Sequence, residues 1–240
     1  MEPQLQNWDN FCRYYADDLS GTWSKYSAEG KLVDSFECIR SFRVLHDGSE
    51  ISHQNHYIYA DGKTESKVFN SYKKPITQGL FLDNCFSWGS AKVETGNSFF
   101  FDTCLRHEDY RASAIARYDE SGNLQRMTVL SERQGSFVKN SAVSTMKTNN
   151  ELQGWMTRIT PDWIVSPTTE TKWTQLEDLN DSHLIFHFND GISVSFPQHV
   201  ESGKEFFLAM DWLCNDTLLK RGTRHYNSSG FSSLTLEFTQ

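Results

Sequence analysis

Histidine, asparagine and tyrosine alternate along residues 50–60, so that His53, Asn55 and Tyr57 share one face of an expected strand. Facing a cavity, such a row would orient the polar group of a ligand, and His53 would serve as an acid or a base near neutral pH. The alternative is an exterior polar face with the tyrosines packed on neighbouring strands. His56 lies on the opposite face and no third ligand has suitable spacing, so we expect no metal.

Arginine and phenylalanine share a face of the preceding expected strand, residues 35–46. Arg40 and Phe42 point to the same side because side chains alternate along a strand. If that side faces a cavity, Arg40 is an anchor for a ligand carboxylate, since a guanidinium binds this group through paired hydrogen bonds. If it faces elsewhere, Arg40 pairs with a carboxylate on a neighbouring strand.

A third expected strand, residues 110–118, has alanine at every second position around Ala114 and charged Arg117 on its other face. Small side chains on a barrel wall leave room, which either a ligand or large residues such as Phe99 and Phe101 would fill. Packing is the favoured interpretation, although Ala114 stays a candidate ligand contact. Arg117 is a candidate for holding an anionic group.

The most apolar run of the chain, residues 206–213, contains a single carboxylate, Asp211. A buried carboxyl needs an arginine or several donors, or its pKa rises so that it stays neutral. Asp211 would therefore act as a general acid in a dry pocket, or it would bind Arg221 or Arg224 on the adjacent strand. The sequence favours the second arrangement.

Composition narrows the classes of partner and location. The 240 residues carry a net charge of −8, which speaks against nucleic acid because that partner requires a basic face. No run of about 20 apolar residues occurs, so we expect no membrane span, and the first residues lack the pattern of a signal peptide. Five scattered cysteines without C-x-x-C spacing are typical of reduced thiols. We therefore expect a cytoplasmic protein.

The elements that must position these residues are mostly strands. Turn signals such as Asp47-Gly48 and Asp61-Gly62 separate short runs rich in aromatic and β-branched residues, which predicts an antiparallel up-and-down meander. Apolar residues recur at helical spacing only near the N-terminus, in residues 4–19. The other expected strands cover residues 21–27, 63–70, 78–83, 86–93, 97–106, 123–133, 154–160, 171–176, 183–189, 191–196, 204–213, 217–226 and 231–238.

The stretch of residues 135–153 is rich in Ser, Asn and Thr and predicts a long connection. It could divide two domains, but the part after it has few strands for an independent closed barrel. We expect a single domain over residues 1–240, an all-β barrel completed by the C-terminal strands and flanked by the N-terminal helix.

The first expected strand begins with Gly21-Thr22-Trp23, and an arginine-rich strand lies near the C-terminus. This pairing resembles the calycin and lipocalin signature. The resemblance implies that the indole of Trp23 plugs the closed barrel end and that Arg224 stacks over it, with Arg221 as the second choice.

Further motifs extend the resemblance to an uncharacterised calycin-like family, known mainly from cyanobacteria, that carries a domain-of-unknown-function label. Calycin-like relatives include bilin lyases, lipid and pigment carriers and a few cyclases, but no bilin-lyase motif is present here. The motifs are Asn7-Trp8-x-x-Phe11, Arg40-Ser41-Phe42-Arg43, Asn55-His56-Tyr57-x-Tyr59 and Tyr118-Asp119-x-x-Gly122-x-Leu124.

These observations predict a barrel cavity that binds a hydrophobic or amphipathic small molecule, such as an isoprenoid, a fatty acid or a linear tetrapyrrole. The alternative is a cofactor-independent lyase, isomerase or cyclase that uses His53, Tyr57 or Asp211 for proton transfer and Arg40 or Arg117 to hold an anionic group. Nucleotide-binding and serine-hydrolase motifs are absent from the sequence, and no cofactor is expected. A third possibility is a structural barrel filled with aromatic side chains.

Overall fold

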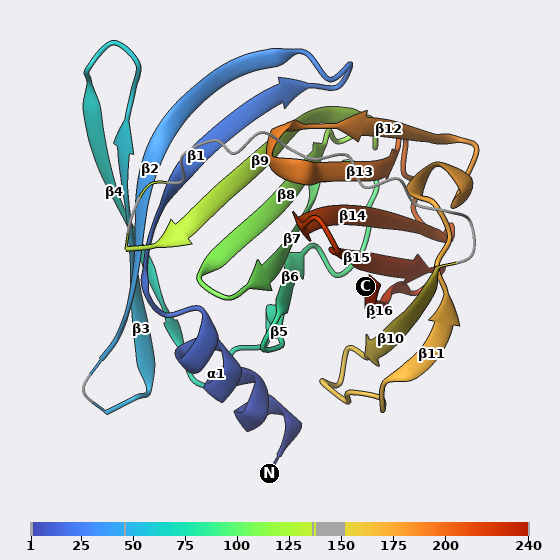
Figure 1. The fold of residues 1–240 in the computed structure, drawn as a ribbon, viewed down its shortest axis with the longest axis horizontal. Helices are drawn as coiled ribbons and strands as arrows, with labels where there is room; N and C mark the ends of the chain where they lie inside the picture. The colour runs from blue at the N-terminus through green and yellow to red at the C-terminus, as the bar shows by residue number, and fades with distance from the viewer. Residues whose placement is uncertain (1, 46, 136, 138–151, 240) are drawn as a thin grey trace.

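A computed structural model gives the structure, which describes residues 2–45, 47–135, 137 and 152–239. One helix, α1 (Pro3–Tyr14), precedes two antiparallel sheets of nine and seven strands (Figure 1). The first sheet contains β1 (Asp18–Ser27), β2 (Leu32–Val44), β3 (Glu50–Ile58), β4 (Thr64–Lys73), β5 (Gly79–Phe81), β6 (Cys85–Gly89), β7 (Phe99–His107), β8 (Tyr110–Tyr118) and β9 (Leu124–Gln134).

The second sheet is built from the C-terminal part of the chain. Two short 3₁₀ helices, η1 (Leu176–Asp178) and η2 (Asn189–Gly191), flank one of its strands. Its strands are β10 (Gln153–Ile159), β11 (Thr169–Lys172), β12 (His183–His187), β13 (Ile192–Pro197), β14 (Phe206–Asn215), β15 (Leu218–Asn227) and β16 (Gly230–Thr239).

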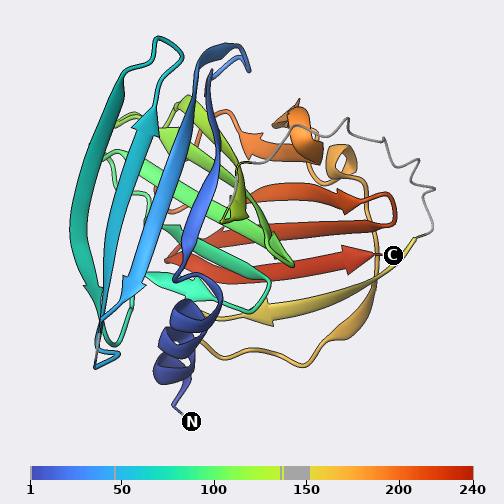
Figure 2. The same cartoon turned by 60° about the vertical axis from the view of Figure 1, so that its left-hand side comes forward.

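The predicted fold class, an all-β barrel-like fold with an N-terminal helix, is confirmed. The strands of the first sheet lie in the order β4-β3-β2-β1-β9-β8-β7-β6-β5, so that β1 pairs with β9 in the middle. The Asp61-Gly62 turn joins β3 to β4, and Gly62 has a φ of +82°, which costs glycine little. This sheet curls into a half-barrel, as Figure 2 shows from the side.

Helix α1 is shorter than the predicted residues 4–19. Its apolar face carries Trp8 and Phe11, which are buried against the first sheet. The helix ends at Tyr14, and the chain then enters β1, where Leu19 pairs with Arg40 of β2 and is fully buried. The last residues of the predicted helix therefore form a strand, because pairing in the sheet buries Leu19 there.

The C-terminal strands do not complete the barrel that we expected. They pair among themselves in the order β11-β10-β16-β15-β14-β13-β12, and this second sheet packs on the outer face of the first (Figures 1 and 2). A Cβ added to Gly222 of β15 would lie 2.7 Å from the Thr103 side chain of β7, so the two sheets approach closely there. The predicted long connection, residues 135–153, falls largely outside the described residues.

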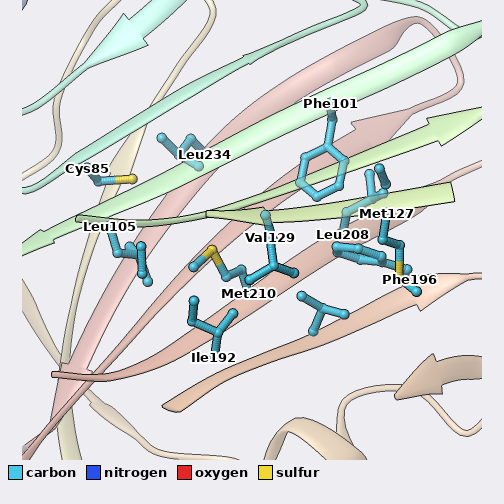
Figure 3. Packing of buried hydrophobic residues seen from close by; sticks show 14 of the residues in the cluster. Cys85, Phe101, Leu105, Met127, Val129, Ile192, Phe196, Leu208, Met210 and Leu234 are labelled. Atoms are coloured by element: carbon cyan, nitrogen blue, oxygen red, sulfur yellow. The ribbon is translucent and has the colours of Figure 1, made fainter. Parts of the chain in front are cut away.

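The main hydrophobic core lies between the two sheets. Each large apolar side chain that becomes fully buried stabilises the fold by about 1.5–3 kcal/mol. Because side chains alternate, β7, β8 and β9 present one set of residues to this core and the other set to the inside of the curl. Figure 3 shows the core residues Phe101, Leu105, Met127 and Val129 of the first sheet with Ile192, Phe196, Leu208 and Met210 of the second.

Within the described part of the chain, no helix is both long and apolar enough to cross a membrane.

Candidate functional site

A cavity of about 370 Å³ lies on the inner face of the curled sheet, where α1 covers one end. Strands β1 to β8 all contribute side chains, because each strand turns alternate residues inward. Aromatic rings supply most of the wall. The lining residues are Phe11, Tyr15, Trp23, Arg40, Phe42, His53, Asn55, Tyr57, Lys67, Phe69, Tyr72, Phe81, Phe86, Trp88, Phe100, Asp102, Arg111, Ile115 and Arg117.

The half-buried Trp23 and the buried Arg40 and Glu132 form a polar cluster where β1, β2 and β9 run side by side. Arg40 makes an ion pair with Glu132, whose other oxygen accepts a hydrogen bond of 3.1 Å from the Trp23 indole. The Arg40 guanidinium also lies 5.7 Å from the centre of that indole. Trp23 therefore stacks with an arginine, as the resemblance implied, but the arginine comes from the neighbouring strand.

The expected stacking of Arg224 on Trp23 is wrong. Arg224 belongs to the second sheet, where its guanidinium lies 3.8 Å from the ring of Phe231 and donates to Ser87 at 3.1 Å. Arg221, the second choice, also lies in that sheet. The sequence spacing could not reveal this, because the prediction assumed one sheet closed by its last strands.

His53 lies at the centre of a hydrogen-bonded row on β3 and β4. Its Nδ1 is 3.1 Å from the Tyr72 hydroxyl and its Nε2 is 2.9 Å from the Asn55 side-chain oxygen. The Asn55 amide in turn donates to the Tyr57 hydroxyl at 2.9 Å. The Asn55 oxygen is an acceptor, so Nε2 carries the proton and Nδ1 accepts from Tyr72. The Tyr57 hydroxyl accepts this bond, so its own hydrogen can be donated to an acceptor of a ligand.

Two rings enclose the imidazole of His53. Phe42 of β2 and Phe69 of β4 stack on its two sides. Each of these rings has its centre 4.3 Å from that of His53. Burial lowers the pKa of His53 to about 4, and the charge of Arg40 acts in the same direction. His53 is therefore a neutral hydrogen-bonding residue at pH 7, with both ring nitrogens already engaged.

We expect His53 to remain uncharged from pH 8 to pH 5. Because its pKa is about 4 in the folded protein and about 6.5 when unfolded, the unfolded state takes up the proton first as the pH falls. The free energy of unfolding should therefore decrease between pH 6.5 and pH 4, by up to about 3 kcal/mol. ¹⁵N NMR of the imidazole and urea unfolding across this range measure the two effects. The variant His53→Gln should lose this share of the pH dependence, whereas an imidazole titration near pH 6.5 would contradict the assignment.

Asp102 of β7 places a carboxyl in the aromatic wall. Although the residue as a whole is partly exposed, its Oδ1 atom is buried and has no hydrogen-bond partner among the described residues. Burial raises the pKa of Asp102 to about 7; Arg40 opposes the shift and Glu132 reinforces it. The carboxyl can therefore exist in both protonation states near neutral pH.

Tyr15, which directly follows α1, and Arg111 of β8 close one end of the cavity. Arg111 of β8 is buried and donates to the main-chain oxygens of Tyr14, at 2.5 Å, and Tyr15, at 3.4 Å. Its guanidinium lies 4.8 Å from the centre of the Tyr15 ring. These carbonyls lie at the C-terminal end of the helix, where a cation is favourable. The Tyr15 hydroxyl is buried without a partner among the described residues.

Two exposed cations stand at the margin of the cavity. Lys67 of β4 has its Nζ 5.0 Å from the ring centre of Phe69, and the guanidinium of Arg117 on β8 lies 5.3 Å from that of Phe100. Exposed charges of one sign at a cavity entrance attract ligands of the opposite sign.

Ala114 does not line the cavity. It lies in the core between the sheets, together with Phe99 and Phe101, on the face of β8 opposite to Arg117. The alternation of a strand cannot direct both Ala114 and Arg117 to one ligand, so their joint assignment as ligand contacts is wrong.

Asp211 also lies away from the cavity. It accepts two hydrogen bonds from Arg221, from Nε at 2.6 Å and from Nη2 at 2.8 Å. Arg221 further donates to the Thr174 main-chain oxygen at 2.8 Å and stacks on Trp173 at 4.3 Å. Of the two roles considered for Asp211, the structure shows the ion pair with Arg221.

The cavity thus brings together six of the seven predicted ligand-binding residues, all except Ala114, and also Trp23. Sequence reasoning missed Asp102, Arg111 and Lys67 as lining residues and Glu132 as the partner of Arg40. Alternation on β8 already placed Arg111 on the face of Arg117. Asp102 carried a comparable signal, because it is the one carboxylate within the apolar run of β7.

The fold and the cavity define an all-β, barrel-like protein with a pocket of the size that holds small molecules. Residues 4–137 match the family described as domain of unknown function (DUF3598), N-terminal, and the chain belongs to this family. The expected membership of an uncharacterised family is thereby confirmed. Residues 139–238 match the family described as biogenesis factor required for ATP synthase 1, C-terminal domain.

Solved structures extend the comparison of the fold. A DUF3598-family protein of unknown function from Nostoc punctiforme PCC 73102 has a TM-score of 0.81 at 20% identity, with 98% of each chain covered. A protein from Bacteroides fragilis NCTC 9343 covers all of both chains at 8% identity, but its TM-score of 0.28 carries no argument. No curated protein matches the sequence significantly.

Proposed function

We propose that the cavity binds an amphipathic small molecule with an apolar body and an anionic group. The observation that carries this proposal is a cavity of about 370 Å³ with aromatic walls and an excess of cations. Its volume lies within the range of small-molecule sites, and aromatic walls bind apolar bodies by burial. The calycin resemblance, in which a curled sheet holds a hydrophobic ligand, supports the same class of molecule.

The charges of the lining favour an anion. Arg40, Lys67, Arg111 and Arg117 line the cavity, and Asp102 is the one carboxyl among the lining residues. Arg40 is balanced by Glu132 and Arg111 is bonded to carbonyls of the helix end. Lys67 and Arg117 therefore remain as the cations best placed to meet a ligand carboxylate, sulfonate or phosphate.

Several buried polar atoms in the wall lack a hydrogen-bond partner among the described residues. The Nε of Arg40, the hydroxyl of Tyr15 and the Oδ1 of Asp102 are buried without hydrogen-bond partners among the described residues. Leaving a buried donor or acceptor unpaired costs about 1–3 kcal/mol. A ligand with a polar end, or water in its place, would recover this free energy.

Binding accounts for these residues better than the alternative of a cofactor-independent lyase, isomerase or cyclase. Of the three residues that we considered for proton transfer, Asp211 lies in the second sheet, paired with Arg221. His53 has both nitrogens engaged, and Tyr57 accepts a hydrogen bond from Asn55.

Two fluorescent probes that differ only in charge test the proposal. N-phenyl-1-naphthylamine is neutral, and 8-anilinonaphthalene-1-sulfonate adds one sulfonate to the same body. Both should bind the purified protein at pH 6.0 with enhanced emission. The double variant Lys67→Met/Arg117→Met should weaken binding of the sulfonate about two- to thirtyfold and leave the neutral probe unchanged, because exposed charge pairs contribute about 0.2–1 kcal/mol each.

The double variant Arg158→Met/Lys172→Met is the matched control. Arg158 and Lys172 are exposed residues of β10 and β11 in the second sheet, outside the cavity lining, so their loss removes the same charge without changing the site. Failure of both probes to bind would overturn the proposal. Equal weakening of the sulfonate by the control variant would show that net charge, rather than the cavity, attracts it.

A further inference from the structure

Asp102 occupies a position that the binding of an anionic amphiphile does not by itself explain. It is a carboxyl in the wall of a cavity whose other ionised lining groups are cations. Its neighbours across the sheet are Trp88 on β6 and Ile115 on β8, and neither offers a cation. Its buried Oδ1 has no partner in the described part of the chain. A charged carboxylate here would repel the ligand that the cations attract.

Charged groups from several strands act on Asp102. Arg40 of β2 and Arg117 of β8 favour its carboxylate, whereas Glu132 of β9 disfavours it. Tyr72 of β4 also faces this region. Arg40 is also paired with Glu132, so its charge acts on two carboxyl groups, and burial outweighs its effect on Asp102. An added anion in the cavity would further disfavour the carboxylate.

We propose, on the basis of the proposed function above, that Asp102 sets the charge selectivity of the cavity. In its protonated form it donates a hydrogen bond to the anionic group of the bound amphiphile. As a carboxylate it repels that group. Above neutral pH, binding of an anion therefore requires uptake of one proton from solvent by Asp102, whereas binding of a neutral ligand does not.

The histidine, the phenols and the nearby thiol keep their charge state near neutral pH. His53 is neutral because burial lowers its pKa to about 4. Burial raises the pKa of Tyr15, Tyr57 and Tyr72, so these phenols are also neutral. Burial raises the pKa of the nearby Cys104 thiol to about 12.

Arg111 and Arg117 do not titrate in this range either. Burial lowers the pKa of Arg111 and Arg117, but an arginine in a protein keeps its charge at neutral pH. Asp102 is thus the group facing the cavity, among the described residues, whose pKa of about 7 makes its charge change there.

The experiment measures the affinity of the two naphthylamine probes at pH 6.0 and pH 8.5. The sulfonate of 8-anilinonaphthalene-1-sulfonate stays ionised throughout, so a pH effect reports on the protein. We expect its Kd to rise at least tenfold from pH 6.0 to pH 8.5, with a limit of about 30-fold for one proton bound at a pKa near 7. The Kd of neutral N-phenyl-1-naphthylamine should change less than twofold.

Asp102→Asn imitates the protonated carboxyl, because the amide is uncharged and still donates a hydrogen bond. This variant should bind the sulfonate with less than a twofold change between the two pH values, and at pH 8.5 it should bind at least tenfold more tightly than the unmodified protein. The matched control is Asp181→Asn, which removes the same charge from an exposed residue ahead of β12. It should keep the full pH dependence.

The outcomes separate the two proposals. If the sulfonate binds with the same Kd at both pH values, or if Asp102→Asn keeps the pH dependence, the role of Asp102 is overturned while the binding cavity stands. If Asp181→Asn loses the pH dependence, net charge rather than Asp102 is responsible and the role of Asp102 is again overturned. If neither probe binds at pH 6.0, both proposals are overturned.

Discussion

Replacement of Asp211 by alanine should lower the free energy of unfolding by about 3–5 kcal/mol, because it removes the ion-pair partner of the buried Arg221 guanidinium. Arg221 is 1% exposed, and it donates two hydrogen bonds to the Asp211 carboxylate. Urea unfolding followed by tryptophan fluorescence measures the loss. The probes of the cavity should still bind to the folded fraction, since the pair lies outside its lining.

Two further variants test whether the loss of stability comes from an unpaired charge in a buried position. Replacing both partners by apolar residues, as in Asp211→Leu/Arg221→Met, should restore most of the lost stability, because neither member of the pair is left buried without the other. Asp34→Ala breaks the ion pair with Lys25, whose side chains are 42% and 38% exposed, and should cost less than about 1 kcal/mol. A loss below about 1 kcal/mol for Asp211→Ala would show that Arg221 finds other partners.

Replacement of Gly21 by alanine should cost about 3 kcal/mol or more, because the methyl group has no space. A Cβ at Gly21 would lie 2.0 Å from the main-chain oxygen of Ser131 and 2.7 Å from the Cα of Glu132, so β1 would have to move away from β9. That movement would disturb the hydrogen bond of Trp23 to Glu132. Urea unfolding measures the loss of stability, and near-ultraviolet circular dichroism reports the tryptophan environment.

Gly62→Ala is the control for this substitution. Gly62 has a φ of +82°, and no atom lies within 4 Å of an added Cβ. Alanine at this position should therefore lower the free energy of unfolding only by the strain of the left-handed conformation, about 1–2 kcal/mol. A loss for Gly21→Ala no greater than that for Gly62→Ala, with an unchanged tryptophan spectrum, would contradict the close approach of β1 and β9.

The local elements of this fold are predictable from the sequence, because turn residues and alternation are local signals. Alternation also placed Arg40 with Phe42, and His53 with Asn55 and Tyr57, on common faces, and these faces meet in the cavity. Which face becomes the inside of the curl is not a local property, since it depends on where the second sheet packs. For this reason Ala114 could not be assigned to the core with certainty.

Interactions between residues that lie far apart in the sequence were harder to predict than the faces of single strands. Glu132 lies 92 residues from Arg40 and 109 from Trp23, and only the pairing of β1 with β9 brings it to them. The prediction of a closed barrel gave Trp23 a different partner, Arg224. The separation into two sheets depends on which strands pair, and alternating patterns in either sheet look alike.

The boundary between the two matched families, near residue 138, does not coincide with a boundary in the hydrophobic core. Phe101 and Met127 precede it, Phe196 and Met210 follow it, and all four belong to the same cluster. Dividing the chain at this point would divide one hydrophobic core. Each of the two fragments would then expose a large apolar face that the other fragment covers in the intact chain. A chain that lacks either segment would therefore need another element to cover this face.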